Sequence, residues 1–116
     1  MVGRLGEERA ATWYTEQGYR VLERNWRGRA GELDLVCSRC AVLVICEVKA
    51  RRAATHGQPF EAVTPDKQRR LRRLAAEYLV TLSTGPSRSE HTFYEEIRFD
   101  VVSVLGRTLE VIEGAF

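Results

Sequence analysis

Residues 31–49 read GELDLVCSRCAVLVICEVK, and this stretch decides the fold of the chain. Two apolar runs, Glu32–Cys37 and Val42–Lys49, are rich in the aliphatic and β-branched residues typical of strands. Only residues 38–41 separate the runs, so we predict that the two strands form an antiparallel hairpin. The second run is apolar on both faces, which is typical of a strand at the centre of a sheet.

The residues before the hairpin predict a helix and a further strand. Apolar side chains at helical spacing, followed by a glycine, indicate a helix over Gly3–Gly18. The alternation in Tyr19–Asn25 predicts a strand, and the glycines of Arg27–Gly31 predict a loop that leads into the hairpin.

The residues after the hairpin predict a second helix and two more strands. Arg51–Val63 is polar and contains a glycine and a proline, so we expect a loop there. Thr64-Pro65-Asp66 supplies a cap, a first-turn proline and a first-turn acid for a helix that runs to about residue 83. A loop over Ser83–His91 then leads to strands at Ile97–Leu105 and Leu109–Ile112.

Length and composition fit one α/β domain over residues 1–116, with at least one helix packed on the sheet. Apolar residues make up 44% of the chain and charged residues 29%, which excludes a disordered chain. The longest apolar run, Cys40–Cys46, is too short to cross a membrane, and because charged residues occur early in the chain we do not expect a secretory signal. The three cysteines are odd in number and offer no matching pairs for zinc. We therefore expect a reduced, cytoplasmic protein that does not associate with a membrane.

Three side chains at the hairpin carry the strongest chemical signal. Glu47 and Lys49 lie two residues apart on one strand, so both point to the same face. Asp34 lies opposite Glu47 if about four residues form the turn, and one diagonal step away if two do. Two close carboxylates raise each other's pKa unless a cation lies between them, and Mg²⁺, with Mn²⁺ as a substitute, fits such a pair. The alternative is that Lys49 only bridges a carboxylate at the sheet edge.

The basic residues gather in the middle of the chain. Residues 49–73 hold eight of them against two acids, a net charge of +6 that attracts phosphate backbones. Charge alone favours the alternative of a solvated helix face. The residues that we predict to bind nucleic acid are Arg51, Arg52, Lys67, Arg69, Arg70, Arg72 and Arg73. Lysine occurs only at positions 49 and 67 among the 18 basic residues, which favours a role for the compact ammonium of Lys49.

Two further polar residues fall on apolar helix faces. Glu7 precedes Ala10 by three residues, and Gln68 precedes Leu71 by three. Both are candidates for the same site. The alternatives are a first-turn acid favoured by the helix dipole at position 7 and a partly buried amide at a sheet edge at position 68.

The chain resembles the YraN-like family in a series of motifs. They are, in order, Gly6-Glu7 with Ala10, Gly18-Tyr19, Gly31–Val36, Glu47-Val48-Lys49, Lys67-Gln68 and Arg98–Val101. This family is assigned to the restriction-endonuclease-like superfamily, whose nucleases carry a PD-(D/E)xK motif. The resemblance covers residues 6–116. It implies a restriction-endonuclease-like fold, with a mixed central sheet of about five strands flanked by helices, similar to that of Holliday-junction resolvases.

The resemblance also implies roles for the residues of the hairpin. Asp34 and Glu47 would bind Mg²⁺ with help from the backbone carbonyl of Val48, and Lys49 would act on the attacking water. The chain has Leu33 where the motif has proline, which is not a reacting group.

Three residues outside the hairpin match the family as well. Glu7 would correspond to the helix acid that supports the metal site, and Gln68 to a polar residue that completes it. Asp100 matches too, but we expect it to be a buried acid bonded to backbone or arginine.

We therefore predict a Mg²⁺-dependent endonuclease that hydrolyses phosphodiester bonds in DNA, with branched or structured DNA as the candidate substrate. One alternative is a nuclease-like module that binds nucleic acid without cutting it. Another is an interaction scaffold indifferent to nucleic acid. A branched substrate would favour a homodimer, because symmetric cuts need paired sites.

Overall fold

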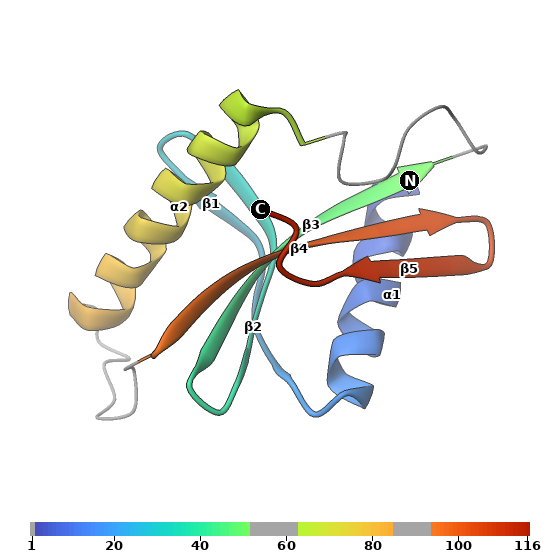
Figure 1. The fold of residues 1–116 in the computed structure, drawn as a ribbon, viewed down its shortest axis with the longest axis horizontal. Helices are drawn as coiled ribbons and strands as arrows, with labels where there is room; N and C mark the ends of the chain where they lie inside the picture. The colour runs from blue at the N-terminus through green and yellow to red at the C-terminus, as the bar shows by residue number, and fades with distance from the viewer. Residues whose placement is uncertain (1, 52–62, 85–93) are drawn as a thin grey trace.

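A computed structural model describes residues 2–51, 63–84 and 94–116 of the chain (Figure 1). Arg52 and most of the two predicted long loops, over 51–63 and 83–91, lie outside the described residues. The elements, in chain order, are α1 (Val2–Glu16), β1 (Arg20–Gly28), β2 (Gly31–Arg39), β3 (Val42–Arg51), α2 (Pro65–Thr84), β4 (Glu96–Leu105) and β5 (Thr108–Ile112).

The five strands form one mixed sheet in the order β1-β2-β3-β4-β5. β3 and β4 run parallel, and the other neighbouring pairs are antiparallel. The central position of β3 confirms the prediction from its two apolar faces. Parallel neighbours cannot be joined by a tight turn, and α2 lies in the crossover between β3 and β4.

The β1–β2 hairpin is longer than predicted. β1 continues to Gly28, which pairs with Gly31, so the predicted loop over Arg27–Gly31 is too long and only Arg29 and Ala30 form the turn. The arginines of β1 do not end the strand because it lies at the sheet edge, where charged side chains reach water. Trp26 fixes this end of the hairpin, since its ring packs edge-on against Tyr78 of α2 with centroids 5.3 Å apart.

The helix boundaries follow the predicted signals closely. The hydroxyl of Thr64 accepts a hydrogen bond from the backbone N–H of Lys67 at 3.2 Å, which caps α2. α1 ends just before Gly18, whose φ of +90° suits glycine. Both predicted helices are confirmed.

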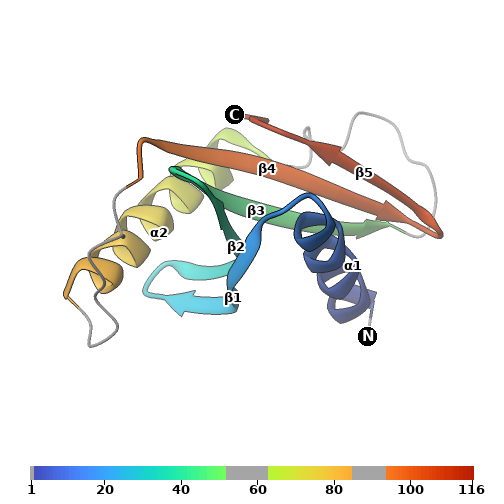
Figure 2. The ribbon, with the colours of Figure 1, turned by 90° about the horizontal axis from the view of Figure 1, so that it is seen from below.

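The two helices cover opposite faces of the sheet, and each covers its own apolar cluster (Figure 2). The buried residues of the α2 cluster include Val36, Leu43, Ile45, Leu71, Leu74, Tyr78 and Phe99. The buried residues of the α1 cluster include Ala10, Tyr14, Leu35, Val44, Cys46 and Val102. Because β3 alternates between the clusters, Glu47 and Lys49 continue the α2 side of the strand.

The sheet forks between β2 and β3. Their pairing ends at Leu35–Cys46, while β2 continues with β1 to its start and β3 continues with β4 to Arg51. Figure 1 shows the free end of the β1–β2 hairpin turning toward α2 while β3 runs on beside β4. We call the point where β2 and β3 separate the fork.

The free end of the hairpin is fixed to α2. The backbone N–H of Arg29 donates to both carboxylate oxygens of Glu77, each at 3.1 Å. A Cβ added at Gly28 would lie 2.7 Å from the Trp26 ring and from Glu77 Oε2 and 2.8 Å from Leu74, so this crowded position favours glycine.

Candidate active site

The two predicted carboxylates lie at the fork. One further step in the β2–β3 register brings Asp34 level with Glu47. The turn contains only residues 40 and 41, for which the sequence predicted a diagonal placement. That prediction is wrong, because a two-residue turn pairs Arg39 with Val42 and so places Asp34 directly opposite Glu47. The pair thus sits where a hairpin ladder ends.

Glu47 contacts both lysines of the chain. Its Oε1 lies 3.3 Å from Nζ of Lys49 and 2.6 Å from Nζ of Lys67. The Glu47 side chain is 8% exposed, and those of Lys49 and Lys67 are 30% and 22% exposed. The salt bridge considered as an alternative for Lys49 is therefore present, and a second lysine shares the same oxygen. We call Asp34, Glu47, Lys49 and Lys67 the carboxylate site.

The negative charge of Asp34 is only partly balanced by its surroundings. Its Oδ2 accepts a hydrogen bond from the backbone N–H of Val48 at 2.9 Å. Burial raises its pKa to about 7, and the Glu47 charge adds to this rise, while the Val48 N–H and Lys67 oppose it. A carboxyl with this pKa titrates near neutrality and gains from an added cation.

The two lysines differ in electrostatic state. Burial and the neighbouring Lys67 ammonium lower the pKa of Lys49. Burial opposes the charge of Lys67 as well, but the hydrogen bond to Glu47 prevails and raises the pKa of Lys67. Lys67 therefore keeps its proton more firmly than Lys49 does.

Glu7 lies on α1, which covers the other side of the sheet from α2. Its negative charge contributes to the raised pKa of Asp34. The preceding residue, Gly6, packs over β3, where a Cβ would make ordinary contact with Val48 Cγ1 at 3.4 Å. The structure thus brings Glu7 into the electrostatic field of the site.

Gln68 points elsewhere. Its side-chain amide donates to the backbone carbonyl of Val63 at 3.1 Å. Among the interactions of the described residues, none joins Gln68 to Asp34 or Glu47. Gln68 is thus a partly buried and satisfied amide, as in the alternative from the sequence, but its partner lies in the bend before α2 and not at a sheet edge.

The predicted nucleic-acid-binding residues have different surroundings. Arg69 pairs with Asp66 on the exposed first turn of α2. The Arg72 guanidinium lies 4.8 Å from the ring centroid of Phe99, and Arg70 and Arg73 are exposed. Arg51 ends β3, and only its backbone is described.

Sequence reasoning assigned Lys67 to the phosphate-binding surface and missed its contact with Glu47. The signal was present, since the chain keeps lysine at only two positions and both meet at this carboxylate. Spacing could not reveal the contact, because Lys67 reaches Glu47 through the packing of α2 on the sheet and not along one element.

Asp100 belongs to a separate cluster and confirms the expectation of a buried acid. It is 0% exposed and accepts four hydrogen bonds at 2.6–3.0 Å, one from Tyr14, two from Arg98 and one from the backbone of Gly114. The Arg98 guanidinium also donates to the Tyr19 hydroxyl at 2.9 Å. We call these five residues the Asp100 cluster.

The donor set of the carboxylate site fits a hard divalent cation that brings its own waters. Across residues 2–51, 63–84 and 94–116, no three His, Cys, Asp or Glu side chains are placed to hold an ion by themselves. Mg²⁺ does not require three, because it binds one or two carboxylates and keeps several waters beside a substrate phosphate. Asp34 and Glu47 supply those carboxylates. Burial and, after it, the Glu47 charge raise the pKa of Asp34, and a bound cation would favour its charged form.

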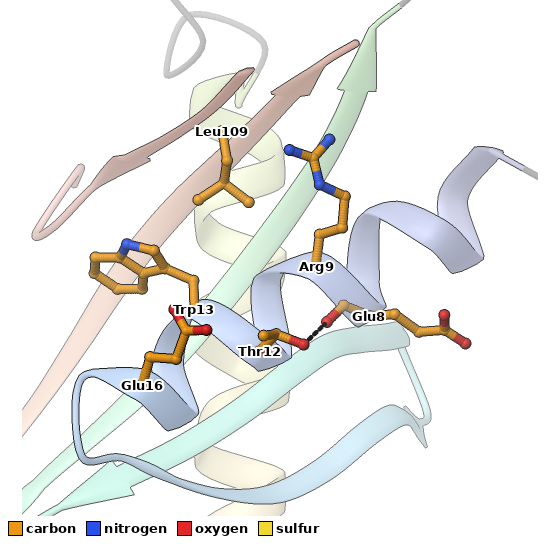
Figure 3. A pocket seen from close by; sticks show the side chains of 6 residues that line it. All are labelled: Glu8, Arg9, Thr12, Trp13, Glu16 and Leu109. Atoms are coloured by element: carbon orange, nitrogen blue, oxygen red, sulfur yellow. Dashed lines mark hydrogen bonds between the residues drawn. The ribbon is translucent and has the colours of Figure 1, made fainter. Parts of the chain in front are cut away.

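A hollow of about 400 Å³ lies between α1 and β5, away from these carboxylates (Figure 3). It is lined by Glu8, Arg9, Thr12, Trp13, Glu16 and Leu109. The Arg9 guanidinium donates to the backbone carbonyl of Arg107 at 2.7 Å, which ties α1 to the β4–β5 turn. None of the predicted site residues lines this hollow.

Fold and site together define an α/β protein with a mixed five-stranded sheet, two helices and a cluster of acids and lysines at a fork. Residues 6–104 match the family described as "Uncharacterised protein family UPF0102". The chain belongs to this family. In the part of the chain that the structure describes, neither helix has the length and apolar character needed to cross a membrane.

Several relatives match most of the chain. The UPF0102 protein of Acidothermus cellulolyticus is 46% identical over 122 residues, 99% of this chain and 92% of that protein. The UPF0102 protein of Streptomyces coelicolor is 48% identical over 117 residues, 98% of this chain and 85% of its own length. That of Symbiobacterium thermophilum is 48% identical over 103 residues, 89% of this chain and 80% of its own length.

Proposed function

We propose that this protein is a Mg²⁺-dependent endonuclease of the restriction-endonuclease-like superfamily, acting on DNA. The observation that carries the proposal is the placement of Asp34, Glu47 and Lys49 on one side of a forked sheet. The order of motifs shared with the YraN-like family of PD-(D/E)xK proteins supports it. Branched or otherwise structured DNA is the proposed substrate, and symmetric cutting of it would require two copies of the chain.

In this proposal Asp34 and Glu47 hold the ion, with the backbone carbonyl of Val48 as a further donor. When bound, Mg²⁺ would polarise the phosphodiester and lower the pKa of a bound water. Lys49 carries its Nζ beside Glu47, and its lowered pKa suits a group that orients the attacking water and exchanges a proton with it. Glu7 adds negative charge near Asp34, which strengthens the attraction for a cation.

DNA would approach over the first turns of α2, the helix that carries Lys67 to the site. Arg70 and Arg73 are exposed there and offer donors to phosphate oxygens. Arg69 can exchange its surface partner Asp66 for a phosphate at little cost, because exposed ion pairs contribute only about 0–1 kcal/mol. Arg72 is held against Phe99 and is less free to do so.

A second candidate function is a module that binds nucleic acid without cutting it. The observation that favours it is that the ammonium groups of Lys49 and Lys67 both form ion pairs with the Glu47 carboxylate. If those bridges persist in the presence of Mg²⁺, the carboxylate is not available to a metal. Binding by the α2 arginines would then remain, with the salt dependence typical of phosphate contacts.

Cleavage assays on purified protein separate the two candidates. Labelled duplex, flap, four-way junction and single-stranded DNA are incubated with Mg²⁺, Mn²⁺ or a chelator. We expect divalent-dependent products that fall by about 10²-fold or more in Asp34→Asn and Glu47→Gln, because each variant removes one charged group of the site. Glu110→Gln, an exposed acid on β5, is the matched control and keeps full activity.

Two outcomes would count against the nuclease. Products that persist undiminished in both carboxylate variants would point to a contaminating enzyme. Binding without products on any substrate, with either metal, would support the non-catalytic module instead.

A further inference from the structure

We infer that Lys67 is a displaceable counter-ion, whose ammonium occupies Glu47 until a divalent cation binds and must then move away. This inference rests on the proposed function, because it concerns the carboxylates that would hold the ion. It assigns to Lys67 a positioning role that differs from the phosphate contact predicted from sequence.

The contacts at Glu47 support competition between the ammonium and a metal. Lys67 Nζ lies 2.6 Å from Glu47 Oε1, closer than Lys49 Nζ at 3.3 Å. Both ammonium groups use the same oxygen, and the Glu47 side chain is only 8% exposed. A divalent ion that reached this oxygen would meet a positive charge at contact distance, which is strongly unfavourable.

Lys67 is better placed to move than Lys49. Lys49 extends from the same strand as Glu47, two residues along, so its ammonium stays beside the carboxylate. Lys67 comes from the first turn of α2, across the gap between helix and sheet, and its flexible four-carbon stem allows the ammonium to swing. Its backbone N–H is held by Thr64, so only the side chain needs to change position.

Without a metal, the Lys67 ammonium stabilises the pair of carboxylates. Asp34 and Glu47 repel each other at the fork, where no ladder of hydrogen bonds joins β2 to β3. The Lys67 ammonium offsets part of that repulsion and keeps both carboxylates in place. The affinity for a divalent ion is then lower than the two carboxylates alone would give, because binding includes displacement of Lys67.

The test measures Mn²⁺ binding to the full chain without DNA, by electron paramagnetic resonance of the free ion and by calorimetry. Lys67→Gln removes the ammonium, and Lys67→Arg keeps the charge at the same position. Arg70→Gln is the matched control, since it removes the same charge from an exposed site one turn further along α2. Circular dichroism and thermal unfolding with a chelator check that each variant is folded.

We expect Lys67→Gln to bind Mn²⁺ about three- to tenfold more tightly than the unmodified chain, as loss of a partly exposed competing charge implies. Arg70→Gln and Lys67→Arg should stay within about twofold of the unmodified chain. In addition, Mn²⁺ should raise the melting temperature of Lys67→Gln more than that of Arg70→Gln.

The inference is overturned if Lys67→Gln binds Mn²⁺ no more tightly than Arg70→Gln, or more weakly than the unmodified chain. It is also overturned if neither the chain nor any variant binds Mn²⁺ at millimolar concentration. These outcomes are distinct from failure of the proposed function, in which Mn²⁺ binds as expected but no DNA is cut.

Discussion

The carboxylate site and the Asp100 cluster contain the same kinds of groups in opposite electrostatic states. Asp100 is fully buried, yet it accepts four hydrogen bonds, two of them from the Arg98 guanidinium. Asp34 is only partly buried, and one backbone N–H is its hydrogen-bond donor among the described residues. Its neighbour Glu47 shares a single oxygen between two lysines.

The difference separates an acid that stabilises the fold from acids available for chemistry. Burial of a charge is tolerated when hydrogen bonds and a counter-charge satisfy it, as at Asp100. At the fork, burial and the nearby Glu47 charge raise the pKa of Asp34. The counter-charges there are the ammonium groups of two flexible lysine side chains. The two carboxylates at the fork therefore lower the stability of the folded protein, and a bound cation would raise it.

Asp100→Ala should have the largest effect on stability. The substitution leaves the Arg98 guanidinium, which is 16% exposed, with only the exposed carboxylate of Glu113 at 3.8 Å, and it removes the acceptor of Tyr14. We expect a loss of about 3–5 kcal/mol in the free energy of unfolding, the usual result of removing one partner of a buried pair. Urea unfolding followed by circular dichroism measures it.

Glu47→Ala is the comparison for that experiment. Its lysine partners are 30% and 22% exposed and can turn toward water, so the loss should not exceed about 1 kcal/mol. Equal losses for Asp100→Ala and Glu47→Ala would contradict the distinction between the two clusters.

Tyr14→Phe should have the next largest effect. It removes the hydroxyl that donates to Asp100 Oδ2 at 2.6 Å and keeps the ring, which packs edge-on against Tyr19. A hydrogen bond to a charged group contributes about 1.5–3 kcal/mol, and we expect a loss of that size in urea unfolding. Thr12→Val, which removes an exposed hydroxyl from the same helix, is the control. A loss no larger than in the control would mean that Arg98 and Gly114 satisfy Asp100 without Tyr14.

Local signals in the sequence predicted several features of the fold and of the carboxylate site. The apolar faces of Val42–Lys49 placed β3 at the centre of the sheet, and the two-residue spacing placed Glu47 and Lys49 on one side of it. The Thr64 cap predicted the start of α2. Each of these features depends on residues within one element or one hairpin, where period and capping rules apply.

Features that depend on contacts between distant elements could not be predicted in the same way. The fork arises because β2 follows β1 while β3 follows β4, and no residue pattern marks the separation. Lys67 reaches Glu47, and Gln68 turns to Val63, because of how α2 packs on the sheet. The continuation of β1 through Arg27 was missed because glycines and arginines resemble a loop, although an edge strand tolerates them.

Asp34→Asn should stabilise the protein in a pH-dependent manner. The folded-state pKa of Asp34 is raised from 3.8 to about 7, so the folded protein binds a proton that the unfolded chain has already released. The stability of the unmodified chain that depends on this group is present in full below pH 4 and is lost as pH rises to about 7. The gain in Asp34→Asn should therefore be absent below pH 4 and reach about 1–3 kcal/mol above pH 7.

Urea unfolding at several pH values measures this gain, with Asp66→Asn as the control because Asp66 is an exposed acid. A gain that is independent of pH would show that the amide acts by packing and not by removing a charge. A loss at high pH would mean that the carboxylate is stabilised by its surroundings, as Asp100 is.

Arg70→Gln combined with Arg73→Gln should have the smallest effect on stability and a clear effect on DNA binding. Both side chains are exposed on α2, so the free energy of unfolding should change by no more than about 0.5 kcal/mol. If they contact phosphates, binding of a duplex with a chelator present should weaken, and the slope of log affinity against log salt should fall by about 1 for each arginine. Arg107→Gln, an exposed arginine in the β4–β5 turn, should leave both quantities unchanged. An unchanged slope in the double variant would place the DNA-binding surface elsewhere and would remove α2 from the proposed path of the substrate to Glu47.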